Sequence, residues 1–94
     1  MECRSLHISK HAMERIVSRD IHIGSLPAVI AASAVIEEYL DDRPHPSYLL
    51  LGFAGKSPLH LVVARTETME CILITAYYPD PEQWDSKFKI RKKV

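Results

Sequence analysis

The spacing of apolar residues near the start of the chain predicts two short helices. Ser9 is a good N-cap residue, and the apolar residues that follow it recur at helical spacing: Ala12, Met13, Ile16 and Val17. They predict a first helix over about 10–19. Gly24 interrupts the pattern, and Ser25 can cap a second helix with Pro27 in its first turn. The run AVIAAS carries that second helix to about residue 33.

From residue 34 onward the apolar pattern favours strands. The four candidate strands are AVIEEYL (34–40), YLLLGFA (48–54), PLHLVVAR (58–65) and ECILITAYY (70–78). A Pro-rich loop, the Gly-containing connection GKS and the polar turn RTETM separate them. Because these connections are short, the strands should form an antiparallel meander. The predicted fold is α+β, with two N-terminal helices packed on one face of a four-stranded antiparallel sheet.

Length and composition indicate one small globular domain over residues 1–94. Apolar residues make up 47% of the chain and charged residues 26%, which is ordinary globular composition. A domain this small buries a modest core, so we expect a partner or a homodimer. The longest apolar run, LPAVIAASAVI, is too short to span a membrane. Cys3 and Cys71 have no paired-motif spacing, which predicts reduced thiols in a cytoplasmic protein.

The net charge is zero, but the charges are unevenly placed. The tail over 86–94, SKFKIRKKV, contains five basic residues and no acid, whereas EEYLDD contains four acids. A basic tail can bind a phosphate backbone or an acidic partner. It can equally be a flexible, solvated terminus that keeps the protein soluble. Both interpretations stay open at this point.

The first predicted helix presents a ridge of basic residues. His11, Arg15 and Arg19 are four residues apart and border the apolar stripe. The two guanidinium groups repel each other, and a phosphate would relieve that repulsion by accepting bidentate hydrogen bonds. The alternative is structural: an arginine pairs with Glu37 or Glu38 while the histidine packs by its ring.

His60 is a polar residue inside a predicted central strand. By strand alternation it faces the same side as Val62, opposite Leu59 and Leu61. Such a histidine can transfer protons near neutral pH, or it can be a hydrogen-bonded core residue. The chain shows no zinc-ligand spacing, nucleophile-elbow motif or phosphate-loop fingerprint. No metal or cofactor is therefore expected.

Tyr77 and Tyr78 lie where the last predicted strand ends. Alternation predicts that Tyr77, Thr75 and Leu73 share one face of that strand. Either tyrosine could orient a phosphate or cap the core. The choice depends on which face each one occupies.

Three segments, in this order, resemble a small bacterial domain family of unknown function related to the BrnT and RelE/ParE type of toxins. They are KHAMERIVSRD, YLLLG with PLHLVVA, and ITAYYPDPEQW. The most distinctive parts are the H-A-x-x-R start and the T-x-Y-x-P end. The resemblance implies a compact RelE/BrnT-like α+β domain in the prokaryotic cytosol and membership of a toxin–antitoxin-like gene pair. An antitoxin-like protein would then be the partner.

Toxins of the related folds cut messenger RNA, often on the ribosome, without a metal. The resemblance therefore implies catalytic roles for His11, Arg15, His60 and Tyr77. A histidine would move protons, the arginines would hold phosphate, and Tyr77 would orient it. The implied phosphate- and RNA-binding residues are Arg19, Thr75, Lys89, Arg91, Lys92 and Lys93.

Overall charge keeps a second function open. RNA-cleaving toxins of this kind are strongly basic, whereas this chain has a pI near 7.0. The alternative is a non-catalytic interaction module that binds a small partner protein through a sheet edge and the basic tail. The ribonuclease hypothesis requires His60 to point into the same cleft as His11 and Arg15.

Overall fold

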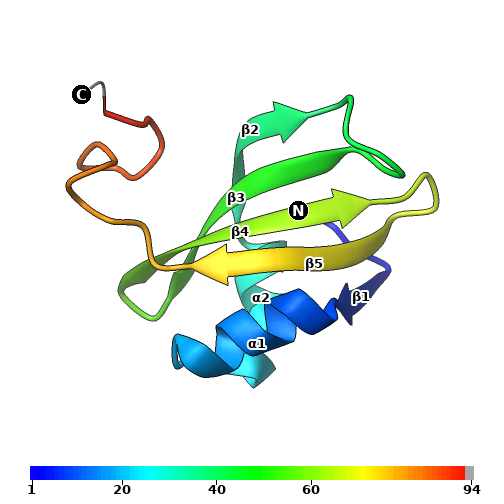
Figure 1. Cartoon of the computed structure of the whole chain (residues 1–94), viewed down its shortest axis with the longest axis horizontal. Helices are drawn as coiled ribbons and strands as arrows, with labels where there is room; N and C mark the ends of the chain where they lie inside the picture. Colours follow the sequence, from blue (N-terminus) through cyan, green and yellow to red (C-terminus); the bar gives the residue numbers. More distant parts are fainter. Residues whose placement is uncertain (93–94) are drawn as a thin grey trace.

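The computed structural model describes residues 1–92 and confirms the α+β class (Figure 1). Its strands are β1 (Ser5–Ile8), β2 (Ala34–Tyr39), β3 (Ser47–Ala54), β4 (Ser57–Arg65) and β5 (Glu70–Tyr77). Its helices are α1 (Lys10–Ser18), the 3-10 turn η1 (Ile23–Ser25) and α2 (Leu26–Ala31). In these residues no helix is both long and apolar enough to cross a membrane.

The sheet has five strands in the order β1-β5-β4-β3-β2. Strands β2 to β5 form the predicted antiparallel meander. The prediction of four antiparallel strands is nevertheless wrong, because β1 adds a parallel strand beside β5. The four residues of β1 are too few to show a strand period, and their hydrogen-bonding partners lie at the far end of the sequence. The sheet is therefore mixed (Figure 1).

Both helices cover the same face of the sheet, where the core lies (Figure 1). Ser9 caps α1 as predicted, since its hydroxyl accepts from the Ala12 amide at 3.0 Å. Ser25 occupies the N-cap position of α2 as predicted, but its hydroxyl donates to the His22 carbonyl and does not cap the helix. Helix α2 packs closely on β3 at Gly52, where a Cβ would lie 2.6 Å from the Val29 side chain. The face of the sheet that carries the helices is called the helix face below.

The alternation predicted for β4 is confirmed, since Leu59 and Leu61 enter the core while His60 faces the opposite side. The alternation predicted for β5 is confirmed for Thr75 and Tyr77, which share a face, but it is wrong for Leu73. A register shift between β4 and β5 places Leu73 and Ala76 together in the core. Tyr77 consequently lies on the opposite face from Leu73, in register with His60.

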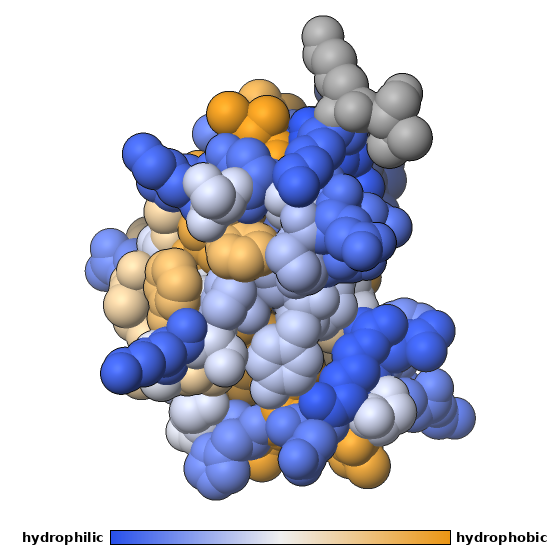
Figure 2. Space-filling model, turned by 90° about the vertical axis from the view of Figure 1, so that its left-hand side faces the viewer, coloured by the Kyte–Doolittle hydropathy of each residue, from blue (hydrophilic) through white to orange (hydrophobic). Residues whose placement is uncertain are grey.

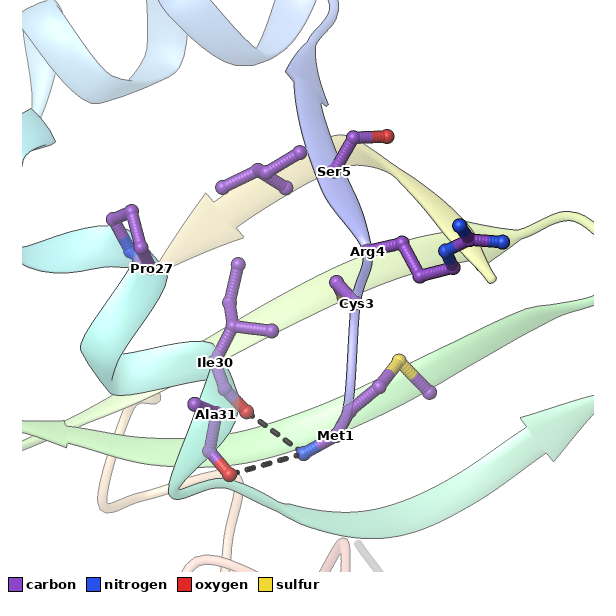
Figure 3. A pocket seen from close by; sticks show the side chains of 8 residues that line it. Met1, Cys3, Arg4, Ser5, Pro27, Ile30 and Ala31 are labelled. Atoms are coloured by element: carbon purple, nitrogen blue, oxygen red, sulfur yellow. Dashed lines mark hydrogen bonds between the residues drawn. The ribbon is translucent and has the colours of Figure 1, made fainter. Parts of the chain in front are cut away.

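The N-terminal segment is attached to the sheet covalently. Cys3 and Cys71 form a disulfide, so the expectation of two reduced thiols is wrong. The terminal amine donates to the carbonyls of Ile30, at 2.8 Å, and Ala31, at 3.4 Å (Figure 3). A hollow of about 390 Å³ lies here, between β1 and α2. Disulfides are typical of oxidising compartments, so this bond gives no support to the cytoplasmic expectation.

Candidate functional site

His60 and Tyr77 form the polar centre of the sheet face opposite the helices. They are direct neighbours across β4 and β5, and the His60 Nδ1 lies 3.2 Å from the Tyr77 hydroxyl. The His60 Nε2 lies 2.7 Å from the Phe88 carbonyl oxygen. The Trp84 ring contacts the imidazole edge-on, with 4.4 Å between ring centroids. His60 is completely buried by these neighbours.

The hydrogen bonds of His60 determine which ring nitrogen carries the proton. A carbonyl oxygen can only accept, so Nε2 is protonated and donates to Phe88. In the neutral ring, Nδ1 then accepts from the Tyr77 hydroxyl. Burial lowers the pKa of His60, against the opposing effect of the Phe88 carbonyl. Burial raises the pKa of Tyr77, so both groups are neutral at pH 7.

The chain after β5 covers this pair with a closed loop over residues 83–92. Trp84 and Arg91 form an isolated antiparallel bridge, and the Lys92 amide donates to the Gln83 carbonyl at 2.8 Å. The Asp85 carboxylate accepts from two backbone amides within the loop. Figure 2 views this end of the molecule, where hydrophilic side chains surround small separate hydrophobic patches. The predicted tail is thus a hydrogen-bonded loop up to residue 92.

A hollow of about 260 Å³ opens beside Tyr77. Its lining residues are Tyr77, Tyr78, Pro79, Asp80, Gln83, Trp84 and Arg91. The Arg91 guanidinium lies over the Trp84 ring, 4.8 Å from its centroid. From α1, Arg19 reaches the same strand end and donates to the Ala76 carbonyl at 2.7 Å. The positive charges of Arg91 and Arg19 oppose the effect of burial on the Tyr77 pKa, whereas the negative charge of Glu37 adds to it.

We call the group Arg19, His60, Tyr77, Trp84 and Arg91 the β5-end site. Tyr77, Trp84 and Arg91 line the hollow, together with the Asp80 carboxylate. His60 and Arg19 do not line it; they are hydrogen-bonded to the Tyr77 hydroxyl and the Ala76 carbonyl. Guanidinium groups bind phosphate, and the phenol–imidazole pair can accept a proton. Among residues 1–92, no three His, Cys, Asp or Glu side chains are grouped to hold a metal ion.

The structure does not bring the other predicted catalytic residues to this site. His11 and Arg15 are exposed on α1, where the Arg15 Nε donates to the His11 Nε2 at 3.3 Å. Because α1 packs on the helix face and His60 points away from it, the predicted convergence is wrong. The alternative pairing of Arg15 or Arg19 with Glu37 or Glu38 is also wrong. Arg15 donates to His11 and Arg19 to the Ala76 carbonyl. Glu37, on β2, accepts from the Tyr39 hydroxyl.

The predicted phosphate-binding residues are divided between the strand and the loop. Thr75 is half-buried on β5, opposite Val62 and on the same side as His60. Lys89 and Lys92 are exposed on the loop beside the β5-end site. Lys93 lies outside the described residues.

Sequence reasoning missed Trp84 and the Phe88 carbonyl. Trp84 is the single tryptophan of the chain, and it occurs in an otherwise polar stretch after two prolines. That isolated large apolar residue was the available signal that the segment folds back onto the domain. No sequence pattern marks the Phe88 carbonyl, because a backbone group contributes it.

The chain, a small α+β domain with this polar site on its sheet, belongs to the family described as Domain of unknown function (DUF4258), whose match covers residues 8–78. No curated protein and no solved structure matches the chain. The family match includes Arg19, His60 and Tyr77 but ends before Trp84 and Arg91. The β5-end site is thus assembled from the family domain and from the segment that follows it.

Proposed function

We propose that this protein is a toxin-like RNA-binding domain that cleaves RNA without a metal, and that the RNA phosphate binds at the β5-end site. The position of Tyr77 is the observation that carries the proposal. Its ring lines the hollow and its hydroxyl is hydrogen-bonded to His60. Burial and the negative charge of Glu37 raise the pKa of this hydroxyl, and the positive charges of Arg91 and Arg19 lower it. The resemblance of the surrounding segments to toxin-related domains supplies the reaction class.

The phenol–imidazole pair can accept the proton that RNA cleavage releases. The ribose 2′-hydroxyl gives its proton to the Tyr77 oxygen while the Tyr77 proton moves to the His60 Nδ1. The 2′-oxygen then bonds to the adjacent phosphorus and the bond from phosphorus to the 5′-oxygen breaks. A water molecule that enters the hollow protonates the leaving oxygen, and the hydroxide so formed takes the proton back from His60 through Tyr77. Tyr77 is the residue that would touch the RNA, and His60 accepts the proton through it.

Arg91 at the hollow would stabilise the charge that develops on the phosphate. A guanidinium offers planar, paired donors that match two phosphate oxygens. Arg91 lies over Trp84, and this contact orients it at the wall of the hollow. Lys89 and Lys92 on the same loop would contact neighbouring phosphates. Asp80 also lines the hollow, so the positive charge for RNA binding would come from the exposed loop residues Lys89, Arg91 and Lys92, although the whole chain is neutral.

A Tyr77→Phe substitution tests the proposal because it removes only the hydroxyl. Purified protein is incubated with a labelled single-stranded RNA; anisotropy measures binding and a denaturing gel measures cleavage. We expect Tyr77→Phe to bind RNA normally and to cleave at least about 100-fold more slowly. The control is Ser18→Ala, which removes an exposed hydroxyl from the end of α1, away from the sheet face that carries Tyr77. The proposal fails if the wild type neither binds nor cleaves RNA, or if Tyr77→Phe cleaves like the wild type.

A growth assay separates the β5-end site from the ridge on α1. Induction of the wild type in bacteria should slow growth and degrade RNA. Tyr77→Phe should relieve this effect, whereas the double variant His11→Ala, Arg15→Ala should retain it because both side chains lie outside the site. Relief by the double variant alone would place the activity on α1 instead.

A non-catalytic interaction module is the second candidate function. The complete burial of His60 favours it, because both ring nitrogens already have partners within the chain. In this case His60 only holds the loop on the sheet. The outer edge of β2 and the basic loop would bind a small acidic antitoxin-like protein or a second copy. Co-purification with the product of the adjacent gene supports this function, and a stable unassisted monomer counts against it.

A further inference from the structure

A second polar hollow lies at the other end of the sheet from the β5-end site. Its volume is about 430 Å³, within the roughly 300–1,000 Å³ typical of small-molecule sites. The β2–β3 loop forms one wall and the β4–β5 turn forms the other. The lining residues are Arg43, Pro44, His45, Pro46, Tyr48, Arg65, Thr66, Glu67 and Met69. Strand β5 runs from this hollow to Tyr77. Its eight residues, at the usual rise of a strand, place the two about 25 Å apart.

The lining of this hollow is cationic. Arg43, Arg65 and His45 line it, and Glu67 is the single carboxylate among its lining residues. Arginine is charged at all physiological pH values, so the hollow has a net positive charge at pH 7. Paired guanidinium donors and an imidazole suit an anion with several oxygens, such as a phosphate. A phosphate alone would leave most of a hollow of this size unfilled.

A planar group inside the hollow can contact the part of the ligand that is not phosphate. The Arg65 guanidinium lies over the Tyr48 ring, 5.7 Å from its centroid. The Arg65 Nη1 also donates to the Glu2 carbonyl at 3.1 Å, which fixes the orientation of the group. A planar guanidinium backed by an aromatic ring stacks well on a planar ligand ring. The ligand chemistry is therefore an anionic group attached to a planar ring.

Hydrogen bonds hold both walls in place before any ligand arrives. On the loop side, Ser47 donates to the Asp42 carboxylate, and the Arg65 amide donates to the Pro46 carbonyl at 3.1 Å. On the turn side, the Met69 amide donates to the Thr66 carbonyl at 3.0 Å. A ligand that enters a preformed site loses less free energy to the ordering of the protein.

We propose that this hollow binds a nucleoside monophosphate, with the phosphate at Arg43 and His45 and the base against Arg65. This site is separate from the β5-end site and does not depend on RNA cleavage. The same chemistry would accept a free mononucleotide or the 5′-phosphorylated end of an RNA. Residues 43–69 lie inside the family match, so the site belongs to the family domain.

Nuclear magnetic resonance titration of the full chain with 5′-AMP tests the proposal. We expect amide shifts confined to residues 43–48 and 65–69. Adenosine and inorganic phosphate should each bind at least about tenfold more weakly than AMP, since each lacks one half of the ligand. A 5′-phosphorylated trinucleotide that shifts the same amides assigns an RNA end, and AMP binding without it assigns a free nucleotide.

Two substitutions and a matched control complete the test. Arg43→Gln, on an exposed loop, should weaken AMP binding at least about tenfold through the loss of charge-assisted hydrogen bonds. Arg65→Gln should weaken it similarly, and its melting curve verifies folding. Arg15→Gln, an exposed arginine on α1, should change nothing. Absence of shifts at this hollow at about 1 mM AMP, or equal weakening by Arg15→Gln, would overturn the proposal.

Discussion

Replacing His60 with alanine should detach the C-terminal loop from the sheet. The substitution removes the hydrogen bonds to the Tyr77 hydroxyl and the Phe88 carbonyl, each worth about 1 kcal/mol net. It also leaves a cavity beneath Trp84 where a completely buried ring stood, at a further cost of about 1–2 kcal/mol. We therefore expect a loss of about 3 kcal/mol, concentrated in the contacts between the loop and the sheet.

The single tryptophan makes this loss directly measurable. Trp84 is only 2% exposed in the folded chain, so its emission maximum should move to longer wavelength when the loop separates. The core cluster on the helix face does not include Trp84, so circular dichroism should report a later transition than fluorescence in urea. His7→Ala, an exposed histidine on β1, is the matched control and should change stability by less than about 0.5 kcal/mol. Unchanged Trp84 emission in His60→Ala, with a urea midpoint equal to that of the control, would refute the reasoning.

Three further perturbations test other parts of the fold. Burial lowers the pKa of His60, so the unfolded chain binds more protons than the folded chain below about pH 6.5. The free energy of unfolding should therefore fall by up to about 1.4 kcal/mol per pH unit between that pH and the folded-state pKa. Urea titrations should show a smaller fall in His60→Gln. Reducing the Cys3–Cys71 disulfide with dithiothreitol should lower the free energy of unfolding by about 2–4 kcal/mol, whereas Cys3→Ser should be insensitive to the reductant. Gly52→Ala should cost about 1–3 kcal/mol in thermal melts, because its Cβ would meet the Val29 side chain and backbone, and an unchanged melting temperature would contradict that close approach.

The meander was predictable because its information is local. Alternating apolar residues and short connections define β2 to β5, and helical spacing with the Ser9 cap defines α1. Strand β1 was not predictable from pattern, because four residues carry almost no periodic signal and the pairing depends on a distant strand. The disulfide was missed for a related reason. Spacing in sequence says nothing about two cysteines that parallel strand pairing brings together.

The site was predicted in part. Strand alternation correctly placed His60 on the face opposite Leu59 and Leu61, but the same rule failed for Leu73 on β5. The register shift opposite Val62 and Val63 reverses the sides on which the β5 residues after Leu73 lie. Nothing in the apolar pattern of the sequence indicates this shift. Helical spacing grouped Arg19 with Arg15, although the helix ends between them and Arg19 turns to the end of β5. A ridge defined by spacing alone cannot show where the helix stops.

The pairing of β1 with β5 has a consequence for translation. The ribosome synthesises a chain from the N- to the C-terminal end, so the β3–β4 hairpin can form while β5 is still being made. Strand β1 has no partner until Glu70 to Leu73 emerge, and α1 packs chiefly on that same late strand. The first synthesised elements therefore complete their contacts last. Until then the apolar stripe of α1 is exposed on the nascent chain, where a chaperone can bind it.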